Sequence, residues 1–402
     1  MSANHSVFIY NHYMIYERQN YRERIERAFE HAQVVALLGP RQTGKTTLAR
    51  SYVREDFPEA NYFDLEDPVS LQRLENPKLA LESLEGLVII DEIQRAPDIF
   101  PILRVLIDRP GANTRFLVLG SASRDLLRQS SETLAGRIAY IEIAPFATNE
   151  VGMDKLHTLH LRGGFPPSFL AKSDQVSSDW RESYIRTFLE RDIPALGISI
   201  PSHTLRRFWM TLSHYHGQLI NLSEIGSSFG IAHTTAQNYI DLLCGTFMVR
   251  RLTPWFENIN KRQVKRPKLY FRDSGILHKL LGITTRDELL TNPKLGFSWE
   301  GFALEEIIRA SNAREEEVYF WQVHQQAELD LLIIKNGKRL GFEIKYMDAP
   351  KLTPSMQKAA ELLRLDALTV IYPGSVEIKL SEGVTALGLV QCLSGMQDAI
   401  SS

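Results

Sequence analysis

Short apolar runs alternate with amphipathic stretches over the first third of the chain. These runs are VVALL from Val34, NYFDL from Asn61, LVII from Leu87, RFLVLG from Arg115 and IAYIEI from Ile138. Strands that alternate with helical segments form βαβ units, in which the strands pair in parallel. We therefore predict an α/β domain over residues 1–150, with helices on both faces of a mostly parallel sheet and an amphipathic helix from Tyr21 to Ala32 before it.

The pattern changes after residue 150. Residues 151–202 contain a Gly-Gly-Phe-Pro-Pro turn from Gly163 and a helical stretch from Trp180 to Glu190, and we expect a helical, lid-like connector there. Residues 203–256 show helical periodicity in three segments, which begin at Leu205, Asn221 and His233 and are followed by the strand-like run FMVRRL. Two helices joined by a tight turn, followed by a β-wing, predict a winged helix-turn-helix.

The last part, residues 257–402, has the pattern of a separate α/β domain. A helix is expected over 299–309, strands over 327–334 and 339–346, a second helix over 353–363 and a strand over 367–372. The dipeptide Asn336-Gly337 separates the first two strands, and Asn-Gly is the strongest two-residue hairpin signal. A hairpin is therefore predicted at this point.

A glycine-rich string follows the first strand and precedes a helical run. The string GPRQTGKTT consists of Gly39, Pro40, Arg41, Gln42, Thr43, Gly44, Lys45, Thr46 and Thr47, and it matches the pattern G-x-x-x-x-G-K-[ST]. In that context backbone N–H groups cradle phosphates, the lysine reaches the β- and γ-phosphates and the following hydroxyl ligates Mg²⁺. We predict a site for ATP with Mg²⁺, with a chance match to a short pattern as the alternative.

The strand LVII ends in two carboxylates, which weakens that alternative. We expect Asp91 to hold Mg²⁺ and Glu92 to orient and deprotonate the attacking water. The run NYFDL lies between the lysine strand and the acid strand, and we take this extra strand to place the catalytic glutamate and a later polar sensor. Ser121, at the end of the run RFLVLG, is the first choice for that sensor, and Ser123 is the second.

These motifs together resemble the AAA-type ATPases. The string Leu-Ala-Gly-Arg137 stands just before the strand IAYIEI, where such ATPases carry the arginine finger that completes a neighbouring subunit's site. The resemblance implies that Arg137 stabilises charge on the transferring phosphate in trans and that the chain forms a homo-oligomer. A surface or intradomain salt bridge is the other interpretation of this arginine.

The predicted hairpin fixes a second set of charged residues. With Asn336 and Gly337 at the centre of the turn, Asp330 faces Glu343 and Glu328 faces Lys345, and side-chain alternation puts all four on one face. Two facing carboxylates repel each other, and a divalent cation between them offsets that repulsion. The alternative is that these charges line a solvated face of the sheet.

The spacing Asp330…Glu343-Ile-Lys345 resembles the PD-(D/E)xK nuclease core. That resemblance implies a metal site completed by Glu300 from the preceding helix. The whole order resembles the prokaryotic AAA-type ATPases with a C-terminal restriction-endonuclease-like domain of unknown function. The matching strings are GPRQTGKTTLAR, IIDEIQRAP, GSAS, LAGR, GGFPP, FLERDI, KLYFRDSGI, WEGFALEE, ELDLLI and FEIKY. The expected fold class is therefore α/β, with an AAA-type P-loop domain, a winged helix and a nuclease-like α/β domain, in a bacterial or archaeal cytoplasmic ATPase.

DNA binding stays open at this point. The candidate recognition helix exposes Thr234, Thr235, Gln237, Asn238 and Asp241 but carries no lysine or arginine for phosphates. Basic residues lie nearby in Arg250, Arg251 and the run Lys261, Arg262, Lys265, Arg266 and Lys268. One hypothesis is an ATPase that acts on DNA through its C-terminal modules. The other is an ATP-dependent oligomeric switch that binds a protein partner and has an inactive nuclease-like domain.

Composition limits these functions only loosely. The 402 residues include 46 Lys and Arg against 48 Asp and Glu, for a net charge of −2, so nucleic-acid binding requires a local basic patch. The two cysteines form no disulfide framework, which suits a reducing cytosol. No apolar run reaches about 18 residues, so we expect no transmembrane helix and a cytoplasmic location.

Overall fold

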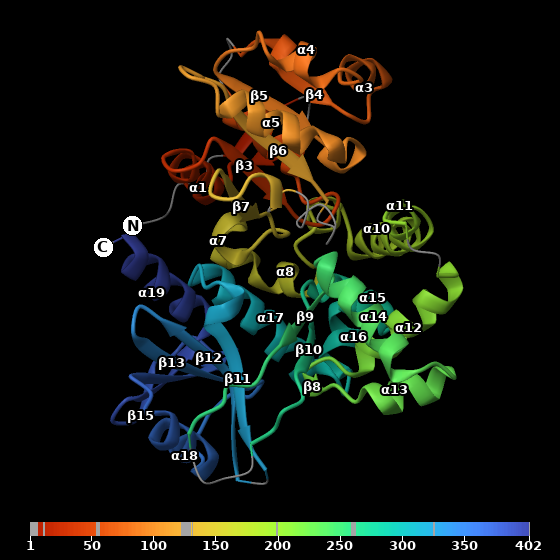
Figure 1. Cartoon of the computed structure of the whole chain (residues 1–402). Helices are drawn as coiled ribbons and strands as arrows, with labels where there is room; N and C mark the ends of the chain where they lie inside the picture. Colours follow the sequence, from red (N-terminus) through yellow and green to blue (C-terminus); the bar gives the residue numbers. More distant parts are fainter. Residues whose placement is uncertain are drawn as a thin grey trace. The chain divides into compact units, whose positions relative to one another are not determined.

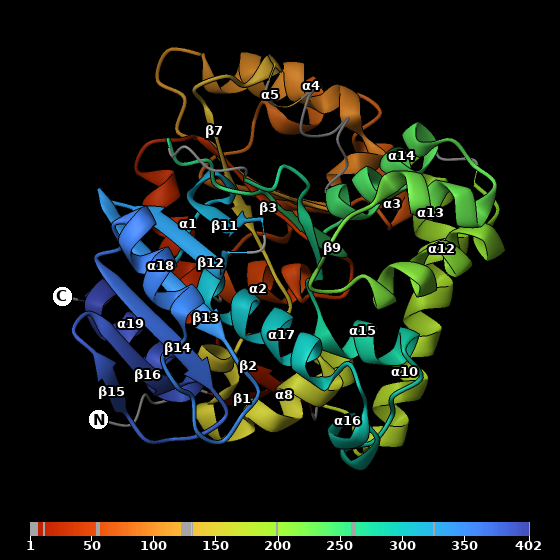
Figure 2. The ribbon, with the colours of Figure 1, turned by 90° about the horizontal axis from the view of Figure 1, so that it is seen from below.

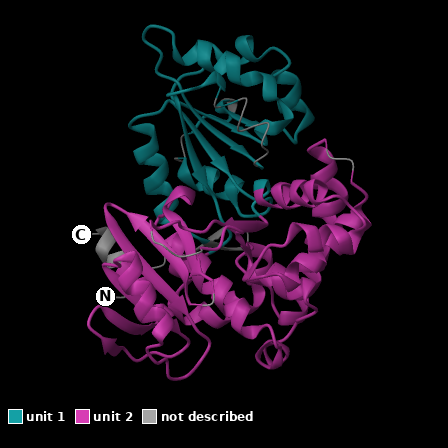
Figure 3. Ribbon diagram, turned by 60° about the horizontal axis from the view of Figure 1, so that its bottom comes forward, with its two compact units in different colours: residues 1–146, 245–247 teal, residues 147–244, 248–402 magenta. Residues whose placement is uncertain are grey.

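The computed structural model describes residues 7–10, 13–53, 57–121, 130, 132–197, 200–258, 263–324 and 326–401. The chain divides into two compact units (Figure 3). Unit 1 consists of Met1–Phe146 with Gly245–Phe247, and unit 2 consists of Ala147–Cys244 with Met248–Ser402. Among the described residues, no helix combines the length and the apolar character that a membrane crossing requires.

A five-stranded parallel sheet forms the centre of unit 1 (Figure 1). Its strands are β3 (Val34–Leu38), β4 (Tyr62–Asp64), β5 (Leu87–Asp91), β6 (Arg115–Gly120) and β7 (Ile138–Glu142). They lie in the order β4-β5-β6-β3-β7, which confirms the five predicted strands and their parallel pairing. The expected role of NYFDL was wrong, because β4 lies at the edge and β6 is the strand inserted between the lysine strand and the acid strand.

Alternate residues of these strands face two separate layers of helices. Val34, Ala36 and Leu38 pack toward α3 (Pro68–Arg73), α4 (Pro77–Leu81) and α5 (Phe100–Ile107). Val35 and Leu37 pack toward α1 (Gln19–Phe29) and α2 (Lys45–Tyr52). Because both faces are covered, the inner strands β3, β5 and β6 are apolar and buried along most of their length, as expected for a parallel sheet. A two-stranded hairpin, β1 (Val7–Tyr10) with β2 (Tyr13–Tyr16), precedes α1.

Unit 2 begins with short helices. They are α7 (Thr148–Val151), α8 (Leu156–Arg162), α9 (Pro166–Phe169), α10 (Asp174–Thr187) and α11 (Ile193–Ala195). A π-helical turn over Phe188–Asp192 joins α10 to α11, so the helical stretch predicted over residues 180–190 forms part of a longer helical segment. Ser173 caps α10 by accepting a hydrogen bond from the backbone N–H of Val176.

Three helices and three short strands follow. They are α12 (Ser202–His214), β8 (Gln218–Leu219), α13 (Leu222–Phe229), α14 (His233–Gly245), β9 (Val249–Leu252) and β10 (Lys268–Phe271). The expected apolar faces meet in one core, where Leu205, Phe208, Ile225 and Ile240 are buried. Gly230 adopts φ 65° at the end of α13, which a residue with a Cβ rarely adopts. β9 pairs antiparallel with β10, and α15 (Ser274–Leu280) and α16 (Arg286–Thr291) come next.

A six-stranded mixed sheet forms the last part of unit 2. Its order is β11 (Val318–Val323), β12 (Ala327–Lys335), β13 (Lys338–Ile344), β14 (Ala367–Tyr372), β16 (Val384–Gly388) and β15 (Ile378–Ser381). Helix α18 (Pro354–Leu363) packs on β12 and β13, while α17 (Leu295–Ala310) and α19 (Leu389–Ser401) contact each other and the central strands (Figure 2).

The predicted hairpin has the expected turn and register. Asn336 and Gly337 have φ values of 51° and 75°, as a type I′ turn requires. The pairs run from Lys335↔Lys338 to Leu331↔Phe342, which confirms the predicted register. Beyond these pairs the geometry changes, because the β11–β12 register shifts and Asp330 and Leu331 both fall opposite Phe320. Such a bulge re-aims the side chains beside it.

Candidate functional site

The glycine-rich loop joins β3 to α2 at the carboxyl edge of the sheet in unit 1. A Cβ added to Gly39 would lie 2.2 Å from the carbonyl oxygen of Ile143, so only glycine fits there. Gln42 and Gly44 have φ values of 61° and 87°, which turn the backbone before α2 begins at Lys45. The loop therefore has the geometry in which successive N–H groups face a phosphate.

Lys45 is buried and lies across this loop. Its ammonium group donates hydrogen bonds to the carbonyl oxygens of Gly39, at 3.1 Å, and of Pro40, at 2.8 Å. The Thr43 hydroxyl also donates to the Pro40 carbonyl, at 3.0 Å. The predicted phosphate-binding lysine is thus held by two neutral acceptors, which a phosphate group would outcompete as an ionised acceptor.

Asp91 stands directly against the start of α2. Its Oδ2 accepts hydrogen bonds from the Thr46 hydroxyl, at 2.6 Å, and from the Tyr62 hydroxyl, at 3.1 Å. Burial raises the pKa of Asp91, although these hydrogen bonds act in the opposite direction. A half-buried hydroxyl beside a buried carboxylate is a pair of oxygen ligands that suits Mg²⁺, so the predicted ligands Thr46 and Asp91 fit this ion.

Glu92 follows β5 and adopts φ 56°, a left-handed conformation that turns the chain away after the strand. The side-chain amide of Gln94 donates to its Oε2, and Arg41 lies 3.8 Å from the same oxygen. Burial raises the pKa of Glu92, whereas Arg41 and Lys45 lower it by their charge. A carboxylate with a raised pKa is a stronger base, which suits the predicted role.

The other loop-edge residues vary in position. Ser121 is half-buried and follows β6, whose neighbours in the sheet are β3 and β5. Because the strands are parallel, Ser121 lies at the same edge of the sheet as the loop. Thr47 is exposed on the first turn of α2. Ser123, the second choice for a sensor, lies outside the described residues.

Two further residues at this site, Arg18 and Tyr62, were not predicted. The Arg18 guanidinium, which is buried, donates to the carbonyl oxygens of Thr43, at 3.0 Å, and of Ala144, at 2.9 Å, and lies over the ring of Tyr21. Arg18 precedes Thr43 by 25 residues and belongs to no motif, so only the structure shows that it supports the loop. Tyr62 begins β4, which pairs in parallel with β5, and this pairing brings the Tyr62 hydroxyl to Asp91.

Arg137 lies away from the loop. It immediately precedes β7, which runs parallel to β3, so Arg137 lies at the amino edge of the sheet and the loop lies at the carboxyl edge. Its Nε donates to Asp108 Oδ1 at 2.7 Å, and its side chain is 36% exposed. This contact is the intradomain salt bridge that the sequence left as the other interpretation. Any contact of Arg137 with a nucleotide therefore has to be made in trans.

A second cluster lies in unit 2, where the four residues predicted for a nuclease-like site come together. Lys345 Nζ lies 2.8 Å from Glu343 Oε1 and 3.4 Å from Asp330 Oδ2. Asp330 Oδ2 also accepts a hydrogen bond from the backbone N–H of Ile344, at 2.9 Å. Glu300 joins this set from α17 through a shared lysine, Lys268.

Lys268 and Tyr270 enter this cluster from β10 and were not predicted to do so. Lys268 Nζ lies 3.6 Å from Glu300 Oε1 and 3.5 Å from Asp330 Oδ1, and its side chain is only 8% exposed. The Tyr270 hydroxyl donates to Glu300 Oε1 at 2.5 Å. The assignment of Lys268 to an exposed basic run was therefore wrong, because β10 is buried along its whole length and two carboxylates pair with the Lys268 ammonium group.

Glu328 was expected to face Lys345 on the side of the acids. Its Oε2 accepts a hydrogen bond from the side-chain amide of Gln322, at 3.2 Å, and its charge acts to raise the pKa of Lys268 and that of Glu343. Glu328 therefore lies near the cluster, and its place opposite Lys345 stays a prediction.

Burial and charge set unequal pKa values in the cluster. Burial raises the pKa of Glu343 to about 8 and that of Glu300 to about 7, and the charge of Asp330 adds to both shifts. Burial also acts to raise the pKa of Asp330, but the charges of Lys268 and Lys345 outweigh it and hold this pKa below its usual value. Asp330 is therefore the most acidic of the three carboxyl groups, whereas Glu300 and Glu343 are held closer to their protonated forms.

The cluster does not fit the divalent cation that the nuclease resemblance implies. Within the described part of the chain, no group of three or more His, Cys, Asp or Glu side chains could hold a metal ion. Ammonium groups stand between neighbouring carboxylates here, in the order Glu300, Lys268, Asp330, Lys345 and Glu343.

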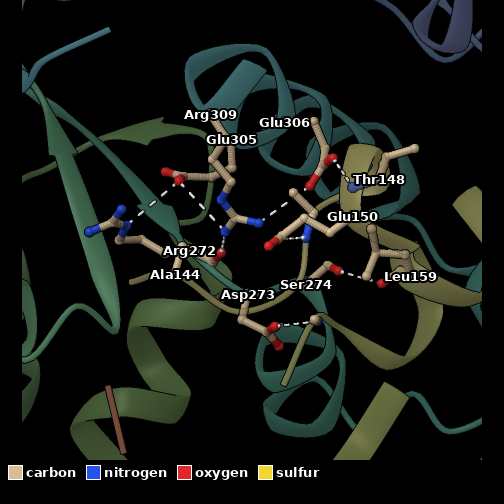
Figure 4. A network of polar contacts seen from close by, with 12 residues as sticks. Ala144, Thr148, Glu150, Leu159, Arg272, Asp273, Ser274, Glu305, Glu306 and Arg309 are labelled. Carbon is tan, nitrogen blue, oxygen red and sulfur yellow. Dashed lines mark hydrogen bonds and ion pairs between the residues drawn. The ribbon is translucent and has the colours of Figure 1, made fainter. Parts of the chain in front are cut away.

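Arg250, expected near a DNA-facing surface, is instead part of a buried network of polar contacts. Its guanidinium makes two hydrogen bonds with Glu305, of 2.5 and 3.1 Å. Glu305 also lies 3.6 Å from Arg272 Nε and 4.0 Å from Arg309 Nη2. Figure 4 shows the neighbouring Glu306 accepting a hydrogen bond from the backbone N–H of Thr148, at 2.7 Å. The expectation for Arg250 was therefore wrong, because its head group neutralises a carboxylate of α17.

The remaining DNA-facing candidates are unevenly placed. Arg251 pairs with Asp241 at 2.7 Å, and Gln237 donates to the same carboxylate at 2.8 Å. Thr234 and Asn238 are exposed on α14 and Thr235 is half-buried. Lys265 and Arg266 are exposed, whereas Lys261 and Arg262 lie outside the described residues.

Three parts of the sequence match known domain families. Residues 31–152 match the AAA domain, and residues 153–287 and 295–392 match two domains of unknown function, DUF8612 and DUF4143. The AAA match spans the five-stranded parallel sheet and the glycine-rich loop of unit 1, which makes this an α/β domain of the P-loop NTPase type.

Distant likenesses to solved structures accompany these matches. The Walker-type ATPase of Pyrococcus abyssi matches 66% of this chain and 96% of its own, with 15% sequence identity and a TM-score of 0.47. RuvB of Thermotoga maritima matches 58% of this chain and 89% of its own, with 17% identity and a TM-score of 0.28.

Two mycobacterial proteins are far more similar in sequence. Uncharacterized proteins of Mycobacterium tuberculosis and Mycobacterium bovis are each 49% identical over 381 residues, which cover 95% of this chain and 86% of each relative. The chain therefore belongs to the same family as these two mycobacterial proteins, and its N-terminal domain is an AAA-type P-loop ATPase domain.

Proposed function

We propose that the chain binds ATP with Mg²⁺ and hydrolyses it. The observation that carries this proposal is the 2.6 Å hydrogen bond between Thr46, in the first turn of α2, and Asp91, which ends β5. It joins the two predicted Mg²⁺ ligands beside the phosphate loop, and Glu92 follows at once in the chain. A chance match to the loop pattern would not bring these groups together.

The chain's own residues account for binding and for activation of water. Lys45 exchanges the carbonyls of Gly39 and Pro40 for the β- and γ-phosphates, and the loop N–H groups orient the chain of phosphates. Glu92 accepts a proton from the attacking water, and its buried setting strengthens it as a base. Mg²⁺, held by Thr46 and Asp91, supplies positive charge at the phosphate oxygens when bound.

We also propose that the site is completed between copies of the chain. Arg137 stands at the sheet edge opposite the loop, so one copy cannot use it on its own nucleotide, and its contact with Asp108 is exposed and exchangeable. In a homo-oligomer Arg137 stabilises transferred charge at the neighbouring copy's site, while Ser121 senses the phosphate at its own.

Binding and turnover are tested separately with matched variants. Lys45→Ala is expected to abolish nucleotide binding, whereas Glu92→Gln keeps binding and loses turnover, since only the base is removed. Arg137→Ala is expected to keep nucleotide binding but to lose turnover, because every site in an oligomer of this variant lacks the arginine of the neighbouring copy. Undiminished hydrolysis by Lys45→Ala would contradict the assignment of the site.

For the rest of the chain we propose a winged helix and a nuclease-like domain, with boundaries close to the predicted 151–202 connector, 203–256 winged helix and 257–402 nuclease-like domain. The order α12-β8-α13-α14-β9-β10 supports the winged helix, with β10 as an added strand. The antiparallel strands β11, β12 and β13, followed by α18 and a parallel β14, support the nuclease-like core.

Two candidate functions follow for these modules. In the first, ATP hydrolysis acts on DNA through them, and the exposed Lys265 and Arg266 support contact with phosphates. In the second, the chain is an ATP-dependent oligomeric switch for a protein partner. The burial of Arg250 and Lys268 in ion pairs favours the second, since these cations are engaged inside unit 2.

The ATPase rate with and without DNA separates these two functions. We would measure it at low salt with single-stranded, duplex and branched DNA, using Lys45→Ala as the background control. Stimulation by any of the three supports action on DNA and is expected to weaken with salt. No stimulation by any of them contradicts action on DNA and leaves the protein-partner switch.

A further inference from the structure

We propose that Lys268 is a tethered cation that occupies the divalent-metal position of the acid cluster formed by Glu300, Asp330 and Glu343. The resting chain would then bind no divalent ion at these acids, and a metal would enter only where Lys268 is removed or withdrawn. This inference is independent of ATP hydrolysis, because it concerns the nucleotide-free chain.

The geometry of Lys268 carries the proposal. Its ammonium group lies between two carboxylates from different elements, 3.6 Å from Glu300 Oε1 on α17 and 3.5 Å from Asp330 Oδ1 on β12. It also lies 5.6 Å from the centre of the Phe320 ring, in the strand beside β12. A cation in contact with acids from two elements takes the place that a bridging metal ion would take.

The two lysines of the cluster have different origins. Lys345 directly follows β13, two residues after Glu343, so it belongs to the same hairpin segment as Asp330 and Glu343 and to the motif predicted there. Lys268 belongs to β10, whose antiparallel partner is β9 and which lies outside the six-stranded sheet. The second ammonium group is therefore supplied by a different module, and its removal leaves the acids and Lys345 in place.

The cluster also contains an unused oxygen. Glu343 Oε2 is buried and has no hydrogen-bond partner among the described residues, while its Oε1 contacts Lys345. A buried carboxylate oxygen without a partner is costly, and a further ligand would satisfy it. Metal binding would use this oxygen, but it would also place a divalent charge close to Lys268. This repulsion between like charges opposes metal binding in the wild-type chain. For Mg²⁺, the high cost of removing water from the ion acts in the same direction.

The connection between β9 and β10, which precedes Lys268, is hydrogen-bonded to β11. The backbone N–H of Trp255 donates to the carbonyl oxygen of Phe320 at 2.7 Å, and that of Val264 donates to Gln322 at 3.0 Å. The chain segments that connect β9 to β10 are thus bonded to β11, next to the strand that carries Asp330. Entry of a metal therefore requires a displacement of β10 or the loss of the Lys268 charge.

Binding of Mn²⁺ to the purified, nucleotide-free full chain tests this proposal. Free Mn²⁺ is followed by electron paramagnetic resonance, and each chain is compared with its Asp330→Asn counterpart, so that ions bound elsewhere cancel. Lys268→Met is the main variant, because methionine keeps the apolar stem and removes the charge. Lys268→Gln is the second variant, since it removes the charge, keeps all three acids and leaves an amide that can donate hydrogen bonds to the carboxylates.

The expected results differ clearly between chains. Wild type should show no Mn²⁺ site that depends on Asp330, whereas Lys268→Met should gain one such site, with an affinity at least about tenfold above the detection limit set by the wild type. If Lys268→Met does not fold by near-ultraviolet circular dichroism, the second variant should show the gain. An Asp330-dependent site in wild type, or no gain in any folded Lys268 variant, would overturn the proposal.

Discussion

Replacement of Glu305 by glutamine tests the buried network that holds α17 against β9. Glu305 is buried, and its carboxylate contacts Arg250, Arg272 and Arg309 at distances between 2.5 and 4.0 Å. Glutamine keeps the size of the side chain and removes its charge, so it leaves three arginines around a neutral group.

Two arguments give the loss of stability expected for Glu305→Gln. Burial alone would raise the pKa of Glu305, but the charges of Arg250 and Arg272 outweigh burial and lower it from 4.5 to about 2. That depression corresponds to about 3 kcal/mol of stability at neutral pH. Removal of one partner of a buried ion pair generally costs about 3–5 kcal/mol, which agrees.

The pH dependence has a definite sign. Because the folded pKa of Glu305 lies below its unfolded value, its stabilisation is present above about pH 4.5 and is lost as the pH falls toward about 2. The difference between wild type and Glu305→Gln should therefore shrink from about 3 kcal/mol at pH 7 to about 1.4 kcal/mol at pH 3.

Urea unfolding at several pH values measures this difference. Glu316→Gln is the matched control, since Glu316 pairs with Arg314 at 3.2 Å but both side chains are exposed, at 64% and 69%. That substitution should change the free energy of unfolding by less than about 0.5 kcal/mol. A loss below about 1 kcal/mol for Glu305→Gln at pH 7, or a loss that does not depend on pH, would refute this reasoning.

Two further predictions concern the two candidate sites. Arg18→Ala should weaken nucleotide binding by about tenfold, because the guanidinium joins the loop carbonyl of Thr43 to that of Ala144 by charged hydrogen bonds. Titration with a fluorescent nucleotide measures this affinity. An unchanged affinity would show that Arg18 does not support the loop. Glu343 has a folded pKa of about 8, above its usual value, so the stability it contributes is present below about pH 4.5 and declines as the pH rises toward 8. Glu343→Gln should remove about 1.4 kcal/mol per pH unit of this decline near pH 6, as measured by urea unfolding, and an unaltered slope would contradict the shifted pKa.

Much of the fold was predictable because its signals are local. The five apolar runs of unit 1 alternate with helices, and Asn336-Gly337 demands positive φ at both turn positions, so strand pairing and hairpin register follow from neighbouring residues. Strands β11, β15 and β16 and helix α19 were not predicted.

The candidate sites were predictable only where a motif carries them. The phosphate loop, Asp91 and Glu92 are short-range patterns, and the acid cluster followed from the hairpin together with the family resemblance. Arg18 and Lys268 act through contacts at long sequence separation, of 126 residues between Arg18 and Ala144, for example. A basic run also favours an exposed interpretation, since lysine is rarely buried without a partner, and the partner of Lys268 is visible only in the folded chain.

ATP turnover by wild type and Glu92→Gln tests the central claim most directly. Both purified chains would be assayed for Mg²⁺-dependent phosphate release and for ATP binding in the same buffer. We predict that wild type releases phosphate only with Mg²⁺. Glu92→Gln should bind ATP with similar affinity but release phosphate at least about 100-fold more slowly. Equal turnover by the two chains, or no ATP binding by wild type, would contradict the account.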